Sequence, residues 1–299
     1  MSLFKKKAGV ATDNQVVLVM TAPAVILMIV FVALPLVMGV QISLTDWNGY
    51  SQDSNFIGLA NYTKLFSDPM FMRAFRNTVI YGFGSTLFQT ILGVLYALLL
   101  QRGFVLRGLT RTIVYLPAMI AQLLVGYVWY FMVQYNRGAL NDVVMALGGT
   151  KLDWLGVGDR AVFIIMIINT LNFCGKAMII YIAGLNSIPD MYYEAASVDG
   201  ANGWQQFWNI TMPQLIPAIT TSTLLNLIGG LKMFGLVIST TGGGPGYSTH
   251  SLSSLINTLY FSYQDAGYAS AVGVVTFVFI MAVSIVIRWY LAKKEAAAQ

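Results

Sequence analysis

The sequence is poor in charge. Only 10% of its 299 residues are Asp, Glu, Lys or Arg, whereas 57% are hydrophobic and the mean hydropathy is +0.69. A soluble domain carries roughly 25% charged residues, so this chain cannot cover a water-exposed surface. The scarcity of charge excludes an ordinary soluble fold and favours an integral membrane protein. The net charge of +5 then fits basic residues that flank membrane segments better than a nucleic-acid-binding surface.

Residue types that carry chemistry are also scarce. Cys174 is the single cysteine, so no internal disulfide can form. His250 is the single histidine, which argues against histidine-rich zinc or iron sites. No G-x-x-x-x-G-K-[ST] phosphate loop occurs, and the segment Gly242–Gly246 has no lysine. We therefore expect no catalytic residues, no metal and no cofactor in this chain.

Long apolar stretches are what the chain has instead. A helix needs roughly 20 residues to cross a bilayer, and six stretches reach that length. They lie near Val16–Leu44, Ala74–Leu100, Arg111–Val133, Ala161–Leu185, Met212–Ser239 and Tyr268–Leu291. The sequence thus predicts an all-α membrane protein with six transmembrane helices, as a single domain over residues 1–299. The first stretch is too long for a signal peptide, so we expect it to stay uncleaved.

Basic residues indicate how these spans are oriented. Six spans put both termini on one side, and a cytoplasmic assignment places nine basic residues inside and six outside. The nine are Lys5, Lys6, Lys7, Arg102, Arg107, Arg111, Arg288, Lys293 and Lys294. We therefore expect a multi-pass protein of the cytoplasmic (inner) membrane with both termini in the cytoplasm.

The fourth connection departs from this charge pattern. Between Lys176 and Lys232 there is no lysine or arginine, yet Asp190, Glu194 and Asp199 are present. By topology this acidic loop lies inside, where positive charge is expected. Either it meets a basic surface on a partner protein, or a well-anchored chain tolerates one deviant loop.

Local signals in this loop predict two short helices joined by a turn. Ser187 is typical of a helix N-cap, and the first helix should end near Val198. Gly200 can take the positive φ that ends a helix. Asn202 can cap a second helix, which should stop before Pro213.

The same loop carries a resemblance to a known family. The signature E-A-A-x3-G-x9-I-x-L-P of ABC importer permeases resembles Glu194, Ala195, Ala196, Gly200, Ile210 and Pro213, with Met212 in place of the usual leucine. Three further stretches look like the carbohydrate-uptake branch, which is similar to the larger membrane subunit of the maltose transporter. They are Ser43–Trp47, Gly58–Tyr62 and the Gly-Gly-Pro stretch Thr241–Gly246.

The resemblance implies a type I ABC importer permease fold and a transport subunit that is not an enzyme. Such a chain forms half of a heterodimeric pore with a second permease subunit and moves a carbohydrate across the lipid bilayer by alternating access. Two ATPase subunits would bind ATP and magnesium, and an extracytoplasmic sugar-binding protein would deliver the cargo. The loop of about 187–213 would be the coupling helix, with Glu194, Ala195, Ala196 and Gly200 docking on an ATPase.

Polar residues inside the spans are candidates for contacts with the cargo. Asn169, Asn172 and Lys176 recur at helical spacing with Phe173 beside them, and Asn226, Gly230 and Met233 share one face of the fifth span. An aromatic ring can stack on a sugar while amides bond its hydroxyls. By resemblance, the family's sugar contacts fall on Asn169, Phe173, Lys176, Asn226, Gly230 and Met233.

Alternatives stay open for these residues and for the chain. The asparagines can instead bond helix to helix, and Lys176 can pair with an acidic sugar or with an aspartate of the second permease. Gly242–Gly246 is either a flexible outer turn or a contact for the binding protein.

A secondary solute transporter without an ATPase is the main rival function for the chain. It needs acidic coupling groups inside the membrane, and every Asp and Glu lies in a loop or near a terminus. An intramembrane enzyme needs clustered catalytic groups, and the neighbours His250 and Ser251 form no triad.

Overall fold

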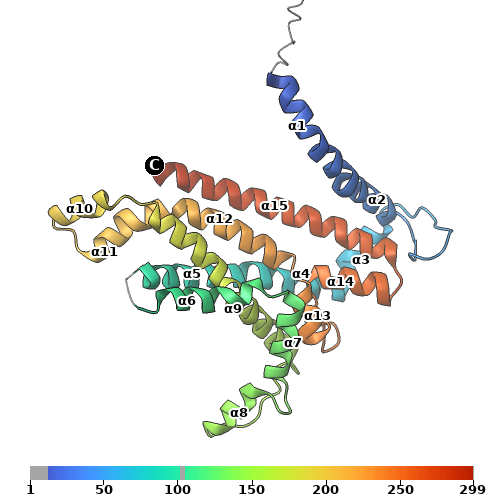
Figure 1. Cartoon of the computed structure of the whole chain (residues 1–299). Helices are drawn as coiled ribbons and strands as arrows, with labels where there is room; N and C mark the ends of the chain where they lie inside the picture. Colours follow the sequence, from blue (N-terminus) through green and yellow to red (C-terminus); the bar gives the residue numbers. More distant parts are fainter. Residues whose placement is uncertain (1–12, 102–104, 299) are drawn as a thin grey trace, which may run out of the picture.

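A computed structural model describes residues 13–101 and 105–298. Lys5, Lys6, Lys7 and Arg102, which the sequence places inside, lie outside these described residues. Every regular element in the described part is helical, apart from one isolated bridge between Thr45 and Phe56. The helices form an elongated bundle from which α1 and α8 project (Figure 1).

Five continuous helical stretches are long and apolar enough to cross a membrane. They are Met20–Ser43, Pro69–Gln101, Gly158–Asn186, Gly203–Leu231 and Ala266–Glu295. A sixth span is obtained if Arg107–Met119 and Gln122–Val133, which meet at 103°, are counted as one broken crossing. The all-α fold with multiple membrane spans is therefore confirmed, and the predicted number of six depends on this bent pair.

Each span is built from one or more helical elements. The first consists of α1 (Asp13–Met28), the π-helical turn η1 (Ile29–Ala33) and α2 (Leu34–Ser43); the second consists of α4 (Pro69–Val79), η2 (Ile80–Gly84) and α5 (Ser85–Gln101). The bent pair is α6 (Arg107–Tyr115) with η3 (Leu116–Met119), followed by α7 (Gln122–Val133). The remaining spans are α9 (Gly158–Asn186), then α11 (Gly203–Gln206), η4 (Phe207–Thr211) and α12 (Met212–Leu231), and finally α15 (Ala266–Ala298).

Shorter helices connect the spans. They are α3 (Ala60–Ser67), α8 (Ala139–Ala146), α10 (Asp190–Val198), α13 (Gly235–Thr241), and α14 (Leu252–Asn257) with η5 (Thr258–Ser262). In Figure 1, α10, α11 and the C-terminus lie at one end of the bundle, and α3 and α14 lie toward the other. We call these the α10 end and the α14 end.

Several predicted boundaries are wrong: the expected span Met212–Ser239 ends at Leu231, and two further differences involve prolines. The expected span Arg111–Val133 is interrupted, because Pro117 falls in η3 and cannot donate to a continuous helical ladder. The helix through Pro213 does not stop there but runs from Gly203 to Leu231. Pro213 is tolerated because it follows the wide π-helical turn η4, where the regular i to i−4 ladder is already altered.

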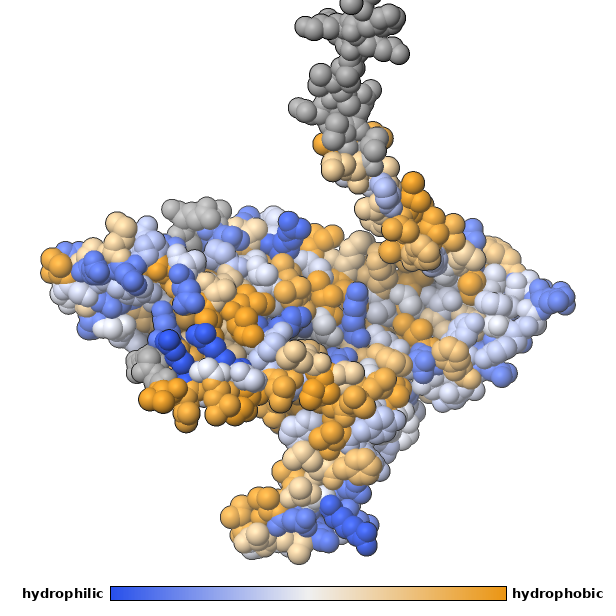
Figure 2. All heavy atoms as spheres, viewed as in Figure 1, coloured by the Kyte–Doolittle hydropathy of each residue, from blue (hydrophilic) through white to orange (hydrophobic). Residues whose placement is uncertain are grey.

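The centre of the bundle is the packing of α5, α9 and α12, which small residues allow to come close. A Cβ on Gly93 of α5 would lie 2.8 Å from the Cβ of Ala177 in α9. A Cβ on Gly230 of α12 would lie 2.9 Å from the Cα of Gly82 in η2. Membrane helices associate through such close backbone contacts because lipid supplies no hydrophobic drive between them. The hydrophobic side chains that remain on the outside of the bundle (orange in Figure 2) are those expected to face lipid.

Candidate functional site

The helix α10 lies at its end of the bundle, where Tyr193 and Ser197 bond it to the following helical segment, and its start differs from the prediction. Its N-cap is Pro189 and not Ser187. Ser187 instead closes α9, where its hydroxyl donates to the carbonyl of Gly184 at 2.7 Å. Because the Ser187 side chain caps the C-terminal end of α9, it is not available as the N-cap of α10.

The turn after α10 is built as expected. Gly200 has φ +79°, and a Cβ added to it would meet no atom within 4 Å, so the turn needs glycine for its backbone conformation alone. Asn202 then caps α11 in a capping box: its Oδ1 accepts from the backbone N–H of Gln205 at 3.0 Å, and Gln205 Oε1 accepts from the N–H of Asn202 at 2.8 Å. These local bonds fix the direction in which α10 points.

The side chains of α10 are available to a partner. Glu194 and Ala195 are exposed, and Ala196 is half-buried. The three salt bridges found among the described residues do not involve Glu194. Beside it, α11 and η4 present exposed Trp204 and Trp208, whose rings meet edge-on at 5.7 Å. An acidic helix flanked by aromatic rings, in a stretch with no lysine or arginine between Lys176 and Lys232, is a surface suited to a basic protein partner.

Most of the residues predicted to contact cargo are buried within the helix bundle. Asn169 is buried and donates to Ser85 Oγ at 3.0 Å, joining α9 to α5. Asn226 is buried and donates to Ser222 Oγ, one turn earlier in α12, at 3.3 Å. Gly230 is packed against η2 and Met233 is buried in the core. In this conformation, these four residues serve helix packing, and their contact with cargo stays a prediction.

Asn172 is placed differently from the other asparagines. Its side chain is 3% exposed, and within the described ranges its Oδ1 has no hydrogen-bond partner. It lines a cavity of about 220 Å³ with Pro117 and Trp129, at the break between η3 and α7. A buried, unpaired amide oxygen is costly, so a water or a ligand hydroxyl in this cavity would satisfy it.

Lys176 and Lys232 are exposed, and Phe173 is half-buried. Neither lysine has a carboxylate within salt-bridge distance in the part of the chain described. A lysine inside a membrane span normally faces a wet cavity or a partner protein and not lipid. Lys176 therefore marks a face of α9 that we expect to be covered by cargo or by another subunit.

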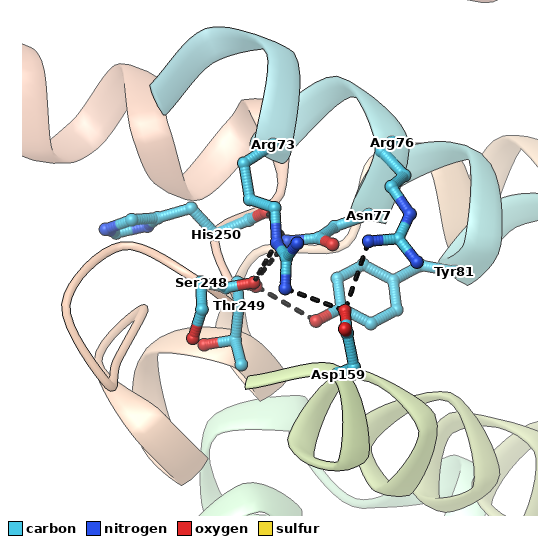
Figure 3. A network of polar contacts seen from close by, with 8 residues as sticks. All are labelled: Arg73, Arg76, Asn77, Tyr81, Asp159, Ser248, Thr249 and His250. Atoms are coloured by element: carbon cyan, nitrogen blue, oxygen red, sulfur yellow. Dashed lines mark hydrogen bonds and ion pairs between the residues drawn. The ribbon is translucent and has the colours of Figure 1, made fainter. Parts of the chain in front are cut away.

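A polar network joins α4, the start of α9 and the segment 248–250, which lie far apart in sequence (Figure 3). Arg73 and Arg76 both donate to Asp159 Oδ1 at the start of α9, at 2.7 and 3.1 Å. Asn77 donates to the carbonyl oxygens of Ser248 and His250 at 2.8 and 2.9 Å. No sequence pattern indicates this network, because Asn77 and Ser248 are 171 residues apart.

The same network holds the glycine-rich segment 242–246 in place. The hydroxyl of Tyr81 donates to the carbonyl of Thr249 at 2.9 Å, just beyond that segment. Gly243 has φ +94°, and its α-carbon faces the ring of His250 so closely that a Cβ would collide with it. Burial lowers the pKa of His250, because desolvation disfavours the charged imidazolium. The segment is therefore an anchored turn in this structure.

Comparison with known proteins finds one matching family model and many relatives. The model, described as "Binding-protein-dependent transport system inner membrane component", matches residues 89–295. The trehalose/maltose transport system permease protein MalF of Thermococcus litoralis is 33% identical over 267 residues, which cover 89% of this chain and 90% of that protein. The multiple sugar-binding transport system permease protein MsmF of Streptococcus mutans is 32% identical over 271 residues, covering 90% and 92%.

A solved structure is also similar over nearly the whole chain. It is that of a bacterial alginate ABC transporter in complex with an alginate pentasaccharide-bound periplasmic protein. The matching chain has a TM-score of 0.76 and 25% identity, and the alignment covers 93% of both chains. The bent third crossing and the helix α10 thus occur in a chain that shares its overall fold with a transporter subunit.

Proposed function

Because the chain belongs to the family of inner-membrane components of binding-protein-dependent transport systems, we propose that it is a permease subunit of an ATP-driven importer for a sugar or oligosaccharide. The family consists of membrane components of transport systems, so the chain is a transport subunit and not an enzyme. Two relatives named for sugar transport align with about nine-tenths of it. These relatives support a carbohydrate as the class of cargo.

The partners follow from the same assignment. The related alginate transporter was solved with a periplasmic binding protein, which supports a binding-protein partner here. The chain supplies half of the pathway, a second permease subunit supplies the other half, and two ATPase subunits bind ATP and magnesium. Uptake then proceeds by alternating access, with no cofactor in this chain.

The helix α10 is the observation on which the ATPase contact rests. Glu194 and Ala195 are exposed on a helix that has no basic residue nearby in sequence, and Gly200 sets its angle to α11. We assign this helix as the coupling helix and place the α10 end in the cytoplasm, together with both termini. A carboxylate at this position can pair with a basic residue of the ATPase, so that closure of the ATPases on ATP moves α11 and α12.

Co-purification tests this assignment. Tagged wild type, Glu194→Lys and Asp190→Lys would be expressed with the ATPase and second permease genes. Wild type should retain the ATPase. Glu194→Lys should retain it at least about tenfold less, because losing one partner of a desolvated charge pair costs about 2–5 kcal/mol and 1.4 kcal/mol is a factor of ten. All three should retain the second permease.

Asp190→Lys is the graded comparison, since it makes the same charge change on an exposed residue of the same face, one turn earlier in α10. It should weaken ATPase retention less than Glu194→Lys does. Full ATPase retention and normal sugar uptake by Glu194→Lys would overturn the coupling role of α10. Failure of wild type to retain any ATPase would instead reopen the secondary transporter.

A further inference from the structure

A second cavity lies near the anchored turn, away from α10. It is an open cleft of about 400 Å³ between α7, α13 and the glycine-rich segment 242–246. Its lining includes Tyr127, Tyr130, Thr240, Thr241, Gly244 and Pro245. Small-molecule sites in proteins occupy roughly 300–1,000 Å³, so the cleft is large enough for a ligand. None of these residues was singled out as a cargo contact by the sequence.

Two tyrosines form one wall of the cleft. Tyr127 and Tyr130 are three residues apart in α7, so they lie on the same side of the helix. Their side chains are 54% and 39% exposed. Gly126 brings this part of α7 against α13, because any Cβ there would collide with Ser239. The two rings therefore flank a tight helix–helix seam instead of packing into the core.

The opposite wall offers polar groups. The hydroxyl of Thr240 donates to the carbonyl of Leu236 at 2.7 Å and so keeps its lone pairs for another donor. At the end of α13, the carbonyl oxygens of Ser239 and Thr240 accept no hydrogen bond from a backbone N–H of the residues that the structure describes. The N–H of Gly243 donates instead to Thr241 Oγ1 at 3.3 Å. Ser239 and Thr240 are only 5% and 3% exposed, but both line the cleft, so the acceptors they offer serve hydroxyl donors that enter it.

The polar wall is fixed before any ligand arrives. The hydroxyls of Thr241 and Thr249 hydrogen-bond at 2.7 Å, and Thr249 Oγ1 donates to the carbonyl of Gly244 at 2.8 Å. Thr249 is in turn held by Tyr81, within the network of Figure 3. A preorganised wall lowers the entropic cost of binding. The network thus has a use beyond stability, because it sets the shape of the cleft.

We propose that this cleft binds one glycosyl unit of a saccharide, with Tyr127 and Tyr130 as its stacking platforms. A pyranose ring has an apolar face of C–H groups that packs on an aromatic ring, while its hydroxyls donate to the carbonyls and Thr240 opposite. The inference rests on the proposed function and deepens it: the cleft is a receiving subsite on the side away from α10, ahead of the mid-span polar residues. Interfacial tyrosines also anchor helices among lipid headgroups, and the experiment separates these roles.

The test measures sugar binding to the complete transporter in nanodiscs. Saturation-transfer difference NMR would be recorded with a mixture of maltose, trehalose and maltotriose on wild type and on Tyr127→Ala, Tyr130→Ala and the double variant. Each single substitution should weaken binding of the responding sugar about three- to tenfold, and the double variant more. Tyr127→Phe keeps the ring and should bind as wild type does.

Tyr135→Ala is the matched control, because Tyr135 is 48% exposed just beyond α7 and does not line the cleft. It should leave the sugar signal unchanged. Equal binding by wild type and the double variant, or no sugar signal from wild type, would overturn the subsite. ATPase retention by the same complexes reports on the proposed function separately, so the two ideas can fail independently.

Discussion

Gly242 and Gly243 are neighbours with positive φ values of 61° and 94°, yet the structure implies different costs for replacing them by alanine. A Cβ on Gly242 would meet no atom within 4 Å, whereas a Cβ on Gly243 would run into the imidazole of His250. Comparing the two substitutions separates the backbone cost from the packing cost within one loop.

The magnitudes follow from these two contributions. An L-residue in the left-handed region costs about 1–2 kcal/mol, which is the full effect expected for Gly242→Ala. Gly243→Ala adds about 1–3 kcal/mol for displacing a buried ring, so it should cost roughly 2–5 kcal/mol in total. In a His250→Ala background the ring is gone, and the cost of Gly243→Ala should fall back to that of Gly242→Ala.

Hydrogen exchange of the complex in nanodiscs provides the assay. The amides of Gly244 and Thr249 bond to carbonyls inside the loop, at 3.0 Å each, and their exchange reports the free energy of local opening. A steric clash at Gly243 is contradicted if Gly242→Ala lowers this free energy as much as Gly243→Ala does. It is equally refuted if the presence of His250 makes no difference, since the coupling is the signature of a steric contact.

Two further outcomes can be checked at the same side of the protein. Asn141 is 1% exposed, and its side-chain amide hydrogen-bonds to Tyr135, Leu152 and Trp154. Asn141→Ala should therefore destabilise the α8 region by about 2–4 kcal/mol and red-shift the fluorescence of Trp154. An unchanged emission spectrum would contradict this. Burial lowers the pKa of His250 below its ordinary value of 6.5, so the unfolded loop binds more protons than the folded loop. Its stability should therefore be highest above pH 6.5 and fall as the pH drops below that value, and His250→Gln should flatten this fall in hydrogen-exchange measurements.

Local signals predicted local structure well where one residue had one possible role. Gly200 takes the expected positive φ, and Asn202 forms the expected cap. The same reasoning failed at Ser187, which ends α9 instead of starting α10. It failed again at Pro213, because the π-helical turn η4 before the proline already alters the regular hydrogen-bond ladder, so the helix continues through it. In both places a neighbouring helix competed for the same residues.

The sequence predicted only part of the polar site inside the spans. Helical spacing predicted that Asn169 and Asn172 lie on one helix. It did not predict which neighbouring helix each side chain would face. One bonds Ser85 of α5, and the other opens onto a cavity beside Trp129. Such spans are apolar nearly all round, so periodicity does not mark an inward face as it does in an amphipathic helix.

The membrane class, the approximate spans and the family motif around Glu194 were all predictable without a structure, because low charge, long apolar runs and turn residues act through neighbours in the chain. The inward packing of Asn226 and the anchoring of the glycine-rich segment by Tyr81 arise only in the folded protein. These features depend on contacts between residues far apart in sequence. No local pattern encodes such contacts, and the cleft beside Tyr127 exists only once they have formed.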